Sequence, residues 1–210
     1  MTDLLKGRPK PVSPSSGAAV ILLAAGASTR MGQKKALLEY QGEAFLDRLI
    51  RVYAEAGAMP YVVLGYDACA IAAGLRRAAE ALLLLNPHPE RGQLSSLQTG
   101  LAALPEACEF VFFTPVDACG IEPATVRLLL DAARSARPPV LVPRHAGRHG
   151  HPVGIDRDVR KELLALDSSG MARSVIHRQR ERTLYVDVDD AAVLWDIDTP
   201  ADWEAIRCRG

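Results

Sequence analysis

The chain has 210 residues, of which 49% are apolar, and its 25 basic and 25 acidic side chains cancel. This length suits one well-buried domain rather than two. Neither sign of charge forms a long block, which argues against a general nucleic-acid binder and predicts that any bound polyanion is a small molecule.

Residues 1–17 combine three prolines with serines and basic residues. Such a segment buries too little apolar surface to order itself, so we predict a flexible leader followed by a single domain over residues 18–210. The sequence has no apolar run typical of a signal peptide or a membrane helix, which indicates a cytoplasmic protein without membrane contact. Its four scattered cysteines show neither zinc-site nor disulfide-scaffold spacing.

From residue 18 onward, short apolar runs alternate with longer segments of helical period, a pattern typical of βαβ units around a mainly parallel sheet. The expected strands are residues 19–24, 61–64, 82–85, 110–113, 140–142, 153–155 and 184–188. The expected helices are residues 44–56, 68–79, 94–104, 124–136, 156–166 and 170–179, with a last one beginning at Pro200. The wholly apolar run 82–85 suits a strand covered on both faces. Ligands of such sheets bind beyond the carboxyl ends of the strands, so the loops after the strands are the candidate functional segments.

The loop after the first strand reads Ala24-Ala25-Gly26-Ala27-Ser28-Thr29-Arg30-Met31-Gly32-Gln33-Lys34-Lys35. Small residues let backbone N–H groups approach phosphate oxygens, and an arginine and a lysine would neutralise the charge of a triphosphate. The spacing fits neither the Walker pattern nor the three-glycine dinucleotide fingerprint. The alternative is an ordinary βα turn with solvated basic residues.

A second candidate loop follows the run 82–85. It contains Asn86, and it ends in Ser95 and Ser96 where a helix is expected to begin. Helix capping by these serines is the interpretation that physical chemistry alone favours, and it leaves a hydroxyl for a ligand.

The run 110–113 continues into Thr114-Pro115-Val116-Asp117 and delivers a carboxylate at the carboxyl end of its strand. Because Mg²⁺ is held by one or two carboxylates together with phosphate oxygens and water, Asp117 is a candidate magnesium ligand. A turn or capping aspartate before Pro123 is the alternative.

The carboxyl-terminal third holds two further candidates. His149 and His151 form a His-x-His pair, which without a nearby carboxylate or cysteine favours hydrogen-bonded loop histidines over a zinc site. Asp196 and Asp198 would point the same way from an extended segment, so one of them could be a second metal ligand. The alternative is that Asp198 or Thr199 caps the last helix.

The first loop, L-A-A-G-A-S-T-R-M-G-Q-K-K, resembles the signature of the MobA-like nucleotidyltransferases, L-A-x-G-x-S-x-R-M-G-x-x-K. In that register Lys35, not Lys34, is the phosphate-binding lysine. Ala25 is similar to the cytidylyltransferase form of molybdenum cofactor maturation and favours CTP, because guanylyltransferases usually show Ala-Gly-Gly. The nucleotide-binding residues that the resemblance implies here are Leu23, Ala24, Ala25, Gly26, Ser28, Arg30 and Lys35.

Later segments resemble the family in the same order along the chain. The stretch from Asn86-Pro87 to Ser96-Leu97 is similar to a segment beside the base and ribose, which implies nucleotide-binding roles for Asn86, Ser95 and Ser96. Gly150-His151-Pro152 resembles an acceptor-side segment, which places His151 beside the acceptor. Asp196-Ile197-Asp198-Thr199-Pro200 resembles the family's ending. In place of the usual Asp-x-Pro, this chain has Thr-Pro-Val-Asp-Ala-Cys around Asp117.

The resemblance implies a three-layer αβα nucleotide-diphosphosugar transferase fold, whose mainly parallel sheet includes one antiparallel strand. It implies Mg-dependent transfer of a nucleoside monophosphate, with CTP as the favoured donor, to a phosphorylated acceptor such as molybdopterin, and release of pyrophosphate. The catalytic residues would be Arg30, Lys35 and Asp117. Asp117 and Asp198 would hold Mg²⁺, with Asp196 an open alternative to Asp198, and a molybdoenzyme would be a partner. Two alternatives are a sugar- or polyol-phosphate nucleotidyltransferase and a noncatalytic nucleotide-binding module, the latter suggested by the unusual Asp117 loop.

Overall fold

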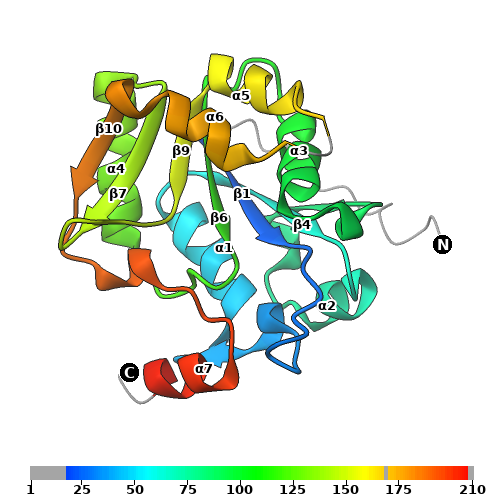
Figure 1. Cartoon of the computed structure of the whole chain (residues 1–210). Helices are drawn as coiled ribbons and strands as arrows, with labels where there is room; N and C mark the ends of the chain where they lie inside the picture. Colours follow the sequence, from blue (N-terminus) through cyan, green and yellow to red (C-terminus); the bar gives the residue numbers. More distant parts are fainter. Residues whose placement is uncertain (1–17, 168–169, 208–210) are drawn as a thin grey trace.

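The computed structural model describes residues 18–167 and 170–207, so the predicted leader, residues 1–17, lies outside the described residues. A central sheet, with helices on both of its faces, runs through the structure (Figure 1). Its strands are β1 (Ala18–Ala24), β4 (Met59–Leu64), β5 (Leu82–Leu85), β6 (Phe110–Pro115), β7 (Val140–His145), β8 (Arg148–His149), β9 (Val153–Asp156) and β10 (Thr183–Asp187). A separate two-stranded sheet joins β2 (Glu39–Tyr40) to β3 (Glu43–Ala44).

The strand order is β10-β7-β9-β6-β1-β4-β5, and β8 pairs with β7. β9 runs antiparallel to both of its neighbours, and the short β8 also pairs antiparallel with β7. The remaining pairs in this sheet are parallel. The prediction of a mainly parallel mixed sheet is therefore confirmed.

The helices between these strands include short 3₁₀ turns. The α-helices are α1 (Phe45–Glu55), α2 (Ala68–Gly74), α3 (Gln93–Ala103), α4 (Pro123–Ala136), α5 (Arg157–Leu164), α6 (Ala172–Arg178) and α7 (Pro200–Arg207). The 3₁₀ helices are η1 (Lys35–Leu37), η2 (Ala78–Glu80), η3 (Pro89–Arg91), η4 (Arg180–Arg182) and η5 (Ala191–Leu194). No helix among the described residues is both long and apolar enough to cross a membrane.

Strand β1 shows how the sequence produces three layers. All seven of its residues are apolar and buried, as expected for a central strand covered on both faces. Because side chains alternate along a strand, Val20 and Leu22 belong to the core that contains α1 and α4, whereas Ile21 and Leu23 belong to the core that contains α3, α5 and α6. The two cores lie on opposite faces of the sheet, which confirms the αβα fold.

Two predictions about elements differ from the structure. The run 82–85 forms the expected strand, β5, and its side chains pack against the cores on both faces, but because β5 lies at the edge of the sheet they are only partly buried and Leu85 is 52% exposed. The helix expected over residues 68–79 ends at Gly74, because the buried carboxylate of Asp47 accepts the backbone N–H groups of Arg76 and Arg77 at 3.1 and 2.9 Å and holds them in a turn. Neither outcome is readable from local hydrophobic periodicity.

The sheet order positions the site. After β1 the chain passes to β4 and β5, and it then returns to the other side of β1 as β6. This reversal of strand order leaves a crevice at the carboxyl ends of β1 and β6. Leu23 pairs with Pro115 there, and Val116 N donates to Leu23 O at 3.1 Å, so the glycine loop and the Asp117 loop start side by side.

Candidate active site

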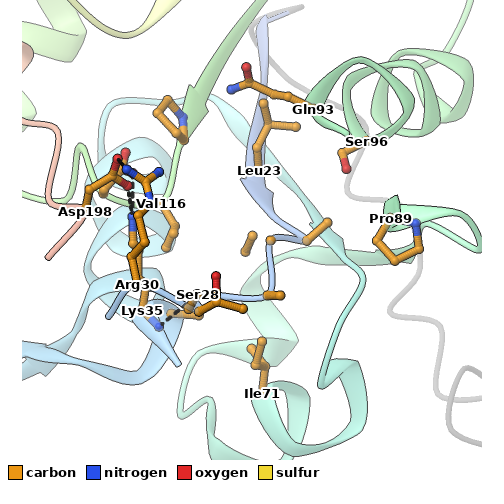
Figure 2. Close-up of a pocket in the computed structure, with 18 of the residues that line it drawn as sticks. Leu23, Ser28, Arg30, Lys35, Ile71, Pro89, Gln93, Ser96, Val116 and Asp198 are labelled. Atoms are coloured by element: carbon orange, nitrogen blue, oxygen red, sulfur yellow. Dashed lines mark hydrogen bonds and ion pairs between the residues drawn. The ribbon is translucent and has the colours of Figure 1, made fainter. Parts of the chain in front are cut away.

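A cleft of 370 Å³ opens at this edge of the sheet (Figure 2). Most of its lining comes from the glycine loop, the segment before and within α3, and the end of β6. The lining residues are Leu23, Ala24, Ala25, Gly26, Ala27, Ser28, Thr29, Arg30, Lys35, Ala36, Ile71, Pro89, Gly92, Gln93, Ser96, Pro115, Val116, Asp117 and Asp198. Figure 2 shows Arg30, Lys35 and Asp198 grouped together, with Gln93, Ser96 and Pro89 across the cleft.

Ser28 shapes the glycine loop. Its φ of 51° is left-handed, which is uncommon for a residue other than glycine. Its carbonyl accepts the N–H groups of Met31 and Gly32 at 3.1 Å each, and its hydroxyl accepts Lys35 N at 3.3 Å. These bonds curl the loop and bring Lys35 back toward the end of β1. Met31 is buried and anchors the curl to the core.

Lys35 and Arg30 contact the carboxylates directly. Lys35 Nζ lies 3.3 Å from Asp117 Oδ2 and 2.5 Å from Asp198 Oδ1, and Arg30 Nη1 lies 2.7 Å from Asp198 Oδ2. The side chain of Lys35 is 12% exposed, whereas that of Lys34 is 40% exposed and pairs with Asp67 at 3.9 Å. Of the two lysines considered from the sequence, Lys35 therefore enters the cleft.

Asp117 is the most buried carboxylate of this group, with 9% of the residue exposed. Burial is the main cause that raises the pKa of its carboxyl from the ordinary value of 3.8 to about 6; Asp196 and Asp198 add to this rise, and Lys35 acts against it. Its Oδ1 atom has no hydrogen-bond partner among the described residues. The unusual Thr-Pro-Val-Asp-Ala-Cys loop thus still presents a carboxylate to the cleft.

Asp196 and Asp198 arrive from the other end of the chain. One oxygen from each of Asp117, Asp196 and Asp198 lies within 4.8 Å of the other two, a spacing suited to a shared cation. From the sequence, Asp196 and Asp198 are alternative candidates for the second metal ligand, but the fold brings both of them close to Asp117. Hydrogen bonding from Lys35 is the main cause that holds the pKa of Asp198 below its usual range.

A capping box at the start of α7 holds Asp198 in place. Asp202 Oδ2 accepts the backbone N–H groups of Asp198 at 3.2 Å and Thr199 at 2.8 Å, and Thr199 Oγ1 accepts Asp202 N at 3.2 Å. Such reciprocal bonds satisfy N–H groups that would otherwise lack partners at a helix start. Thr199 is therefore the capping residue, and the side chain of Asp198 remains directed at Lys35 and Arg30.

The serines do not cap α3 as the local pattern suggested. The helix begins after Gly92, so Ser95 and Ser96 lie within its first turns. Ser95 Oγ donates to the carbonyls of His88 and Gly92, each at 3.0 Å. Asn86 Nδ2 donates to the hydroxyls of Ser95 and Ser96 at 2.9 and 3.0 Å. Among the described lining residues Ser96 faces the cleft, whereas Asn86 and Ser95 support it from behind.

His151 is absent from the described cleft lining. Its backbone N–H donates to Val193 O at 2.7 Å, and its Nδ1 has no hydrogen-bond partner among the described residues. Burial lowers the pKa of its imidazole, while the charge of Asp196 acts in the opposite direction. His151 thus lies on the Asp196 side of the carboxylate group, outside the cleft itself.

A family model described as the MobA-like NTP transferase domain matches residues 20–183. The chain belongs to this family. It is therefore a nucleotidyltransferase, and the family's nucleotide-diphosphosugar transferase fold agrees with the sheet order described above.

Two curated enzymes and one solved structure illustrate the relationships of this MobA-like chain. The molybdenum cofactor cytidylyltransferase of Escherichia coli is 24% identical over 189 residues, which cover 90% of this chain and 95% of that enzyme. The molybdenum cofactor guanylyltransferase of Xanthomonas euvesicatoria is 26% identical over 193 residues, which cover 89% and 92%. Rv0371c of Mycobacterium tuberculosis matches with a TM-score of 0.80 and 28% identity over 90% of this chain and 96% of that one.

The MobA-like cleft also contains residues that the sequence did not single out. Ile71, Pro89 and Gln93 come from α2, η3 and α3 and line the cleft; Pro89 and Gln93 lie on the same side as Ser96, whereas Ile71 lies at the end nearer Ser28 (Figure 2). Gly65 supports this wall, because a Cβ there would lie 2.7 Å from Ala25 O and 2.8 Å from Pro89 Cβ. No local pattern marks these residues, since they become neighbours only when β4 and β5 pair beside β1.

Proposed function

We propose that this MobA-like enzyme transfers CMP from Mg-bound CTP to molybdopterin or its molybdenum form and releases pyrophosphate. Both curated relatives named above are molybdenum cofactor nucleotidyltransferases that differ in the nucleotide. Ala25, in the Ala-Ala-Gly sequence that resembles the cytidylyltransferase form, favours CTP over GTP. Consumption of a nucleoside triphosphate also suits the cytoplasmic location expected from the sequence.

One observation carries the proposal. Two cations, Lys35 and Arg30, and the carboxylates of Asp117 and Asp198 meet where the curled glycine loop leaves β1. A triphosphate needs positive charge and backbone N–H groups, whereas its metal needs carboxylate oxygens. This cleft brings the cations and the carboxylate oxygens into direct contact. An ordinary βα turn with solvated basic residues does not require such contacts.

The carboxylates fit a divalent cation. Asp117 Oδ1 is a buried oxygen without a hydrogen-bond partner among the described residues, and oxygens of Asp196 and Asp198 lie within 4.8 Å of an oxygen of Asp117. Asp117 and Asp198 would hold Mg²⁺, and Asp196 is near enough to contact it directly or through water. A second structure of Rv0371c, with a TM-score of 0.78 and 25% identity over 92% of this chain and 99% of that one, is a complex with manganese. A bound cation would neutralise charge that develops on the phosphates.

The reaction needs positioning more than a protein nucleophile. An oxygen of the acceptor phosphate forms a bond to the α-phosphorus of the nucleotide, and the bond from that phosphorus to the bridging oxygen breaks as pyrophosphate leaves. Backbone N–H groups of the glycine loop would orient the phosphates. Lys35 and Arg30 would stabilise the charge on the leaving pyrophosphate.

The acceptor would approach from the side of Asp196. His151 lies beside the segment that leads to Asp196, because its N–H donates to Val193 O, and we propose that it orients the acceptor through hydrogen bonds. A sugar- or polyol-phosphate acceptor would use the same cleft, because one fold of this kind serves many substrates.

Pyrophosphate release tests the proposal directly. The enzyme is supplied with Mg²⁺, each of the four nucleoside triphosphates in turn, and either molybdopterin or a panel of sugar and polyol phosphates. Release with CTP and molybdopterin is expected. Release only with a sugar phosphate would identify that compound, and not molybdopterin, as the acceptor. A preference for GTP would identify GTP, and not CTP, as the donor. Absence of release from every pair, despite measurable nucleotide binding, would contradict the proposal.

A further inference from the structure

The loop that carries Asp117 is buried along nearly its whole length. Ala118 and Cys119 are at most 1% exposed. Buried carbonyl groups need hydrogen-bond donors, because an unpaired one costs about 1–3 kcal/mol. In this loop the carbonyls of Cys119 and Gly120 both accept from one side chain on a neighbouring helix, Arg48 of α1.

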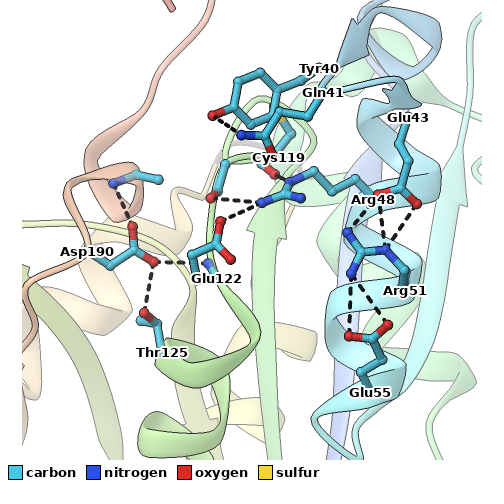
Figure 3. Close-up of polar contacts among 12 residues, drawn as sticks. Tyr40, Gln41, Glu43, Arg48, Arg51, Glu55, Cys119, Glu122, Thr125 and Asp190 are labelled. Carbon is cyan, nitrogen blue, oxygen red and sulfur yellow. Dashed lines mark hydrogen bonds and ion pairs between the residues drawn. The ribbon is translucent and has the colours of Figure 1, made fainter. Parts of the chain in front are cut away.

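Arg48 is itself buried, with 5% of the residue exposed. Its Nε donates to Cys119 O at 2.9 Å, and its Nη2 donates to Gly120 O at 3.5 Å and to Glu122 Oε1 at 2.7 Å. Figure 3 shows the guanidinium pointing away from α1 into this loop. The planar fork of an arginine can serve several acceptors at once, which a lysine ammonium cannot do in the same geometry.

The same arginine also reaches the segment of Asp196 and Asp198 through two aromatic rings. Its guanidinium carbon lies 5.4 Å from the centre of the Tyr40 ring, a cation–π distance. Tyr40 meets Trp195 edge to face, with ring centres 5.3 Å apart. The Trp195 ring lies against Gly120, where a Cβ would overlap it. Arg48, Tyr40, Trp195 and Gly120 therefore form a closed ring of contacts.

Each member of this ring other than Arg48 is close in sequence to a charged residue of the cleft. Tyr40 follows Lys35 by five residues, Gly120 follows Asp117 by three, and Trp195 directly precedes Asp196. The ring thus ties together the three segments that carry Lys35, Asp117 and the Asp196–Asp198 pair. These segments make their mutual contacts across up to 163 positions of the sequence.

We propose that Arg48 is a positioning residue that holds the loop of Asp117 and the segment of Asp198 at the spacing a divalent cation requires. The inference rests on the proposed metal site. Arg48 is not among the described residues that line the cleft. It acts through the carbonyls of Cys119 and Gly120, as partners behind metal ligands commonly do, and loss of such partners weakens metal binding by about 10–100-fold.

Arg51, one turn further along α1, offers a matched control. It also forms ion pairs, with Glu43 at 2.6 Å and Glu55 at 3.4 Å, but these partners lie away from the Asp117 loop (Figure 3). A change at Arg51 therefore perturbs the same helix, and Glu43 opposite Tyr40 in the β2–β3 pair, but it removes none of the bonds that Arg48 makes to the Asp117 loop. Glu122→Gln is a second control. The amide oxygen of the glutamine can still accept from Arg48, and the bonds from Arg48 to the carbonyls of Cys119 and Gly120 remain.

The test is binding of Mn²⁺ alone, measured by titration calorimetry and by the electron paramagnetic resonance signal of free Mn²⁺, on the full chain. For Arg48→Met we expect a dissociation constant raised about 10–100-fold. For Arg48→Lys we expect a smaller, several-fold rise. Arg51→Met and Glu122→Gln should bind as the wild type does. Thermal melts without metal establish that each variant is folded.

Activity against Mg²⁺ concentration adds a readout that a general loss of structure would not produce. The Arg48 variants should need more Mg²⁺ for half-maximal rate, and their kcat should recover at saturating Mg²⁺. A uniformly lowered kcat at every Mg²⁺ concentration would overturn the positioning role. If Arg48→Met does not fold, Arg48→Lys decides, and wild-type Mn²⁺ affinity in that variant would overturn the inference. Equal losses of Mn²⁺ affinity in Arg48→Met and Arg51→Met would also overturn the inference.

The two proposals fail in different ways. If the wild type binds no Mn²⁺, the metal site itself is wrong and the inference falls with it. If the wild type binds Mn²⁺ and folded Arg48 variants bind it equally well, only the inference is wrong.

Discussion

Lys35, the first residue of η1, faces Asp117, which follows the end of β6, with Nζ 3.3 Å from Oδ2. Asp198 completes the contact from the opposite end of the chain. Lys35 and Arg30 thus offset the charges of Asp117 and Asp198 in this structure. A complex of Mg²⁺ with a triphosphate carries both signs of charge, so we expect it to exchange partners with this group: phosphate for the lysine and cation for the carboxylates.

This exchange predicts different outcomes for two adjacent lysines. Lys35→Met should lower kcat about 10²–10³-fold, as loss of one charge-stabilising donor does. Lys34→Met should stay close to the wild type, because its exposed contact with Asp67 is worth less than about 1 kcal/mol. Steady-state kinetics with saturating acceptor measure both. Equal losses of kcat in the two variants would indicate that the loop as a whole, and not Lys35 in particular, stabilises the charge of the phosphates.

Asp117→Asn should abolish metal-dependent turnover and yet stabilise the metal-free fold at neutral pH. The folded-state pKa of Asp117 is raised to about 6 from 3.8, so the folded state holds this proton more tightly than the unfolded state does. Its ionisation therefore destabilises the fold as pH rises from about 4 to 6, by on the order of 1–3 kcal/mol above that range. Asparagine does not titrate and removes this cost.

Urea unfolding in EDTA at pH 8 and pH 4 measures the effect of Asp117→Asn. The variant should be the more stable protein at pH 8, with the difference shrinking toward pH 4. Added Mn²⁺ should raise the stability of the wild type, through mass action on the folded state, and leave the variant unchanged. A variant less stable than the wild type at pH 8 in EDTA would contradict the prediction.

Ala25→Gly should shift the nucleotide preference toward GTP. Ala25 lines the cleft, and its methyl group packs beside Gly65, close to Pro89. Removal of this methyl group widens the cleft, and a change of this size in a pocket alters the discrimination between two substrates about tenfold or more. Competition between CTP and GTP measures the ratio of kcat/KM values. Ala27→Gly adds the same flexibility to the same loop and should leave the ratio unchanged, so a shift in both variants would point to flexibility alone.

Thr199→Ala should lower both stability and activity by loosening α7 and Asp198. Loss of a helix cap costs about 1 kcal/mol, which for a chain of this size lowers the melting temperature by about 2–4 °C. Because Asp202 would lose its partner Thr199 Oγ1, its bond to Asp198 N should weaken and Mn²⁺ affinity should fall. Glu204→Ala, which removes an exposed ion pair from the same helix, should retain Mn²⁺ affinity. An unchanged Mn²⁺ affinity in Thr199→Ala would show that the helix cap does not position Asp198 for metal binding.

The sequence by itself determined what depends on neighbours along the chain. The apolar strand expected over residues 19–24, the glycine loop after it, proline at the first turn of α4 and the Thr199–Asp202 capping pattern all express short-range sterics and hydrogen bonding. The same local order places one basic loop and one carboxylate at strand ends, and the resemblance of these segments to a known family follows from it.

Only the tertiary structure decided which of these pieces meet. Strand pairing brings Asp117 to Lys35 across 82 positions and Asp198 to Lys35 across 163, and it delivers Asp196 together with Asp198. It also exposes β5 at an edge and turns Arg48 toward the Asp117 loop. A buried arginine on an amphipathic helix carries no local sign of its partners, because those partners are backbone carbonyls that become neighbours only when the chain folds.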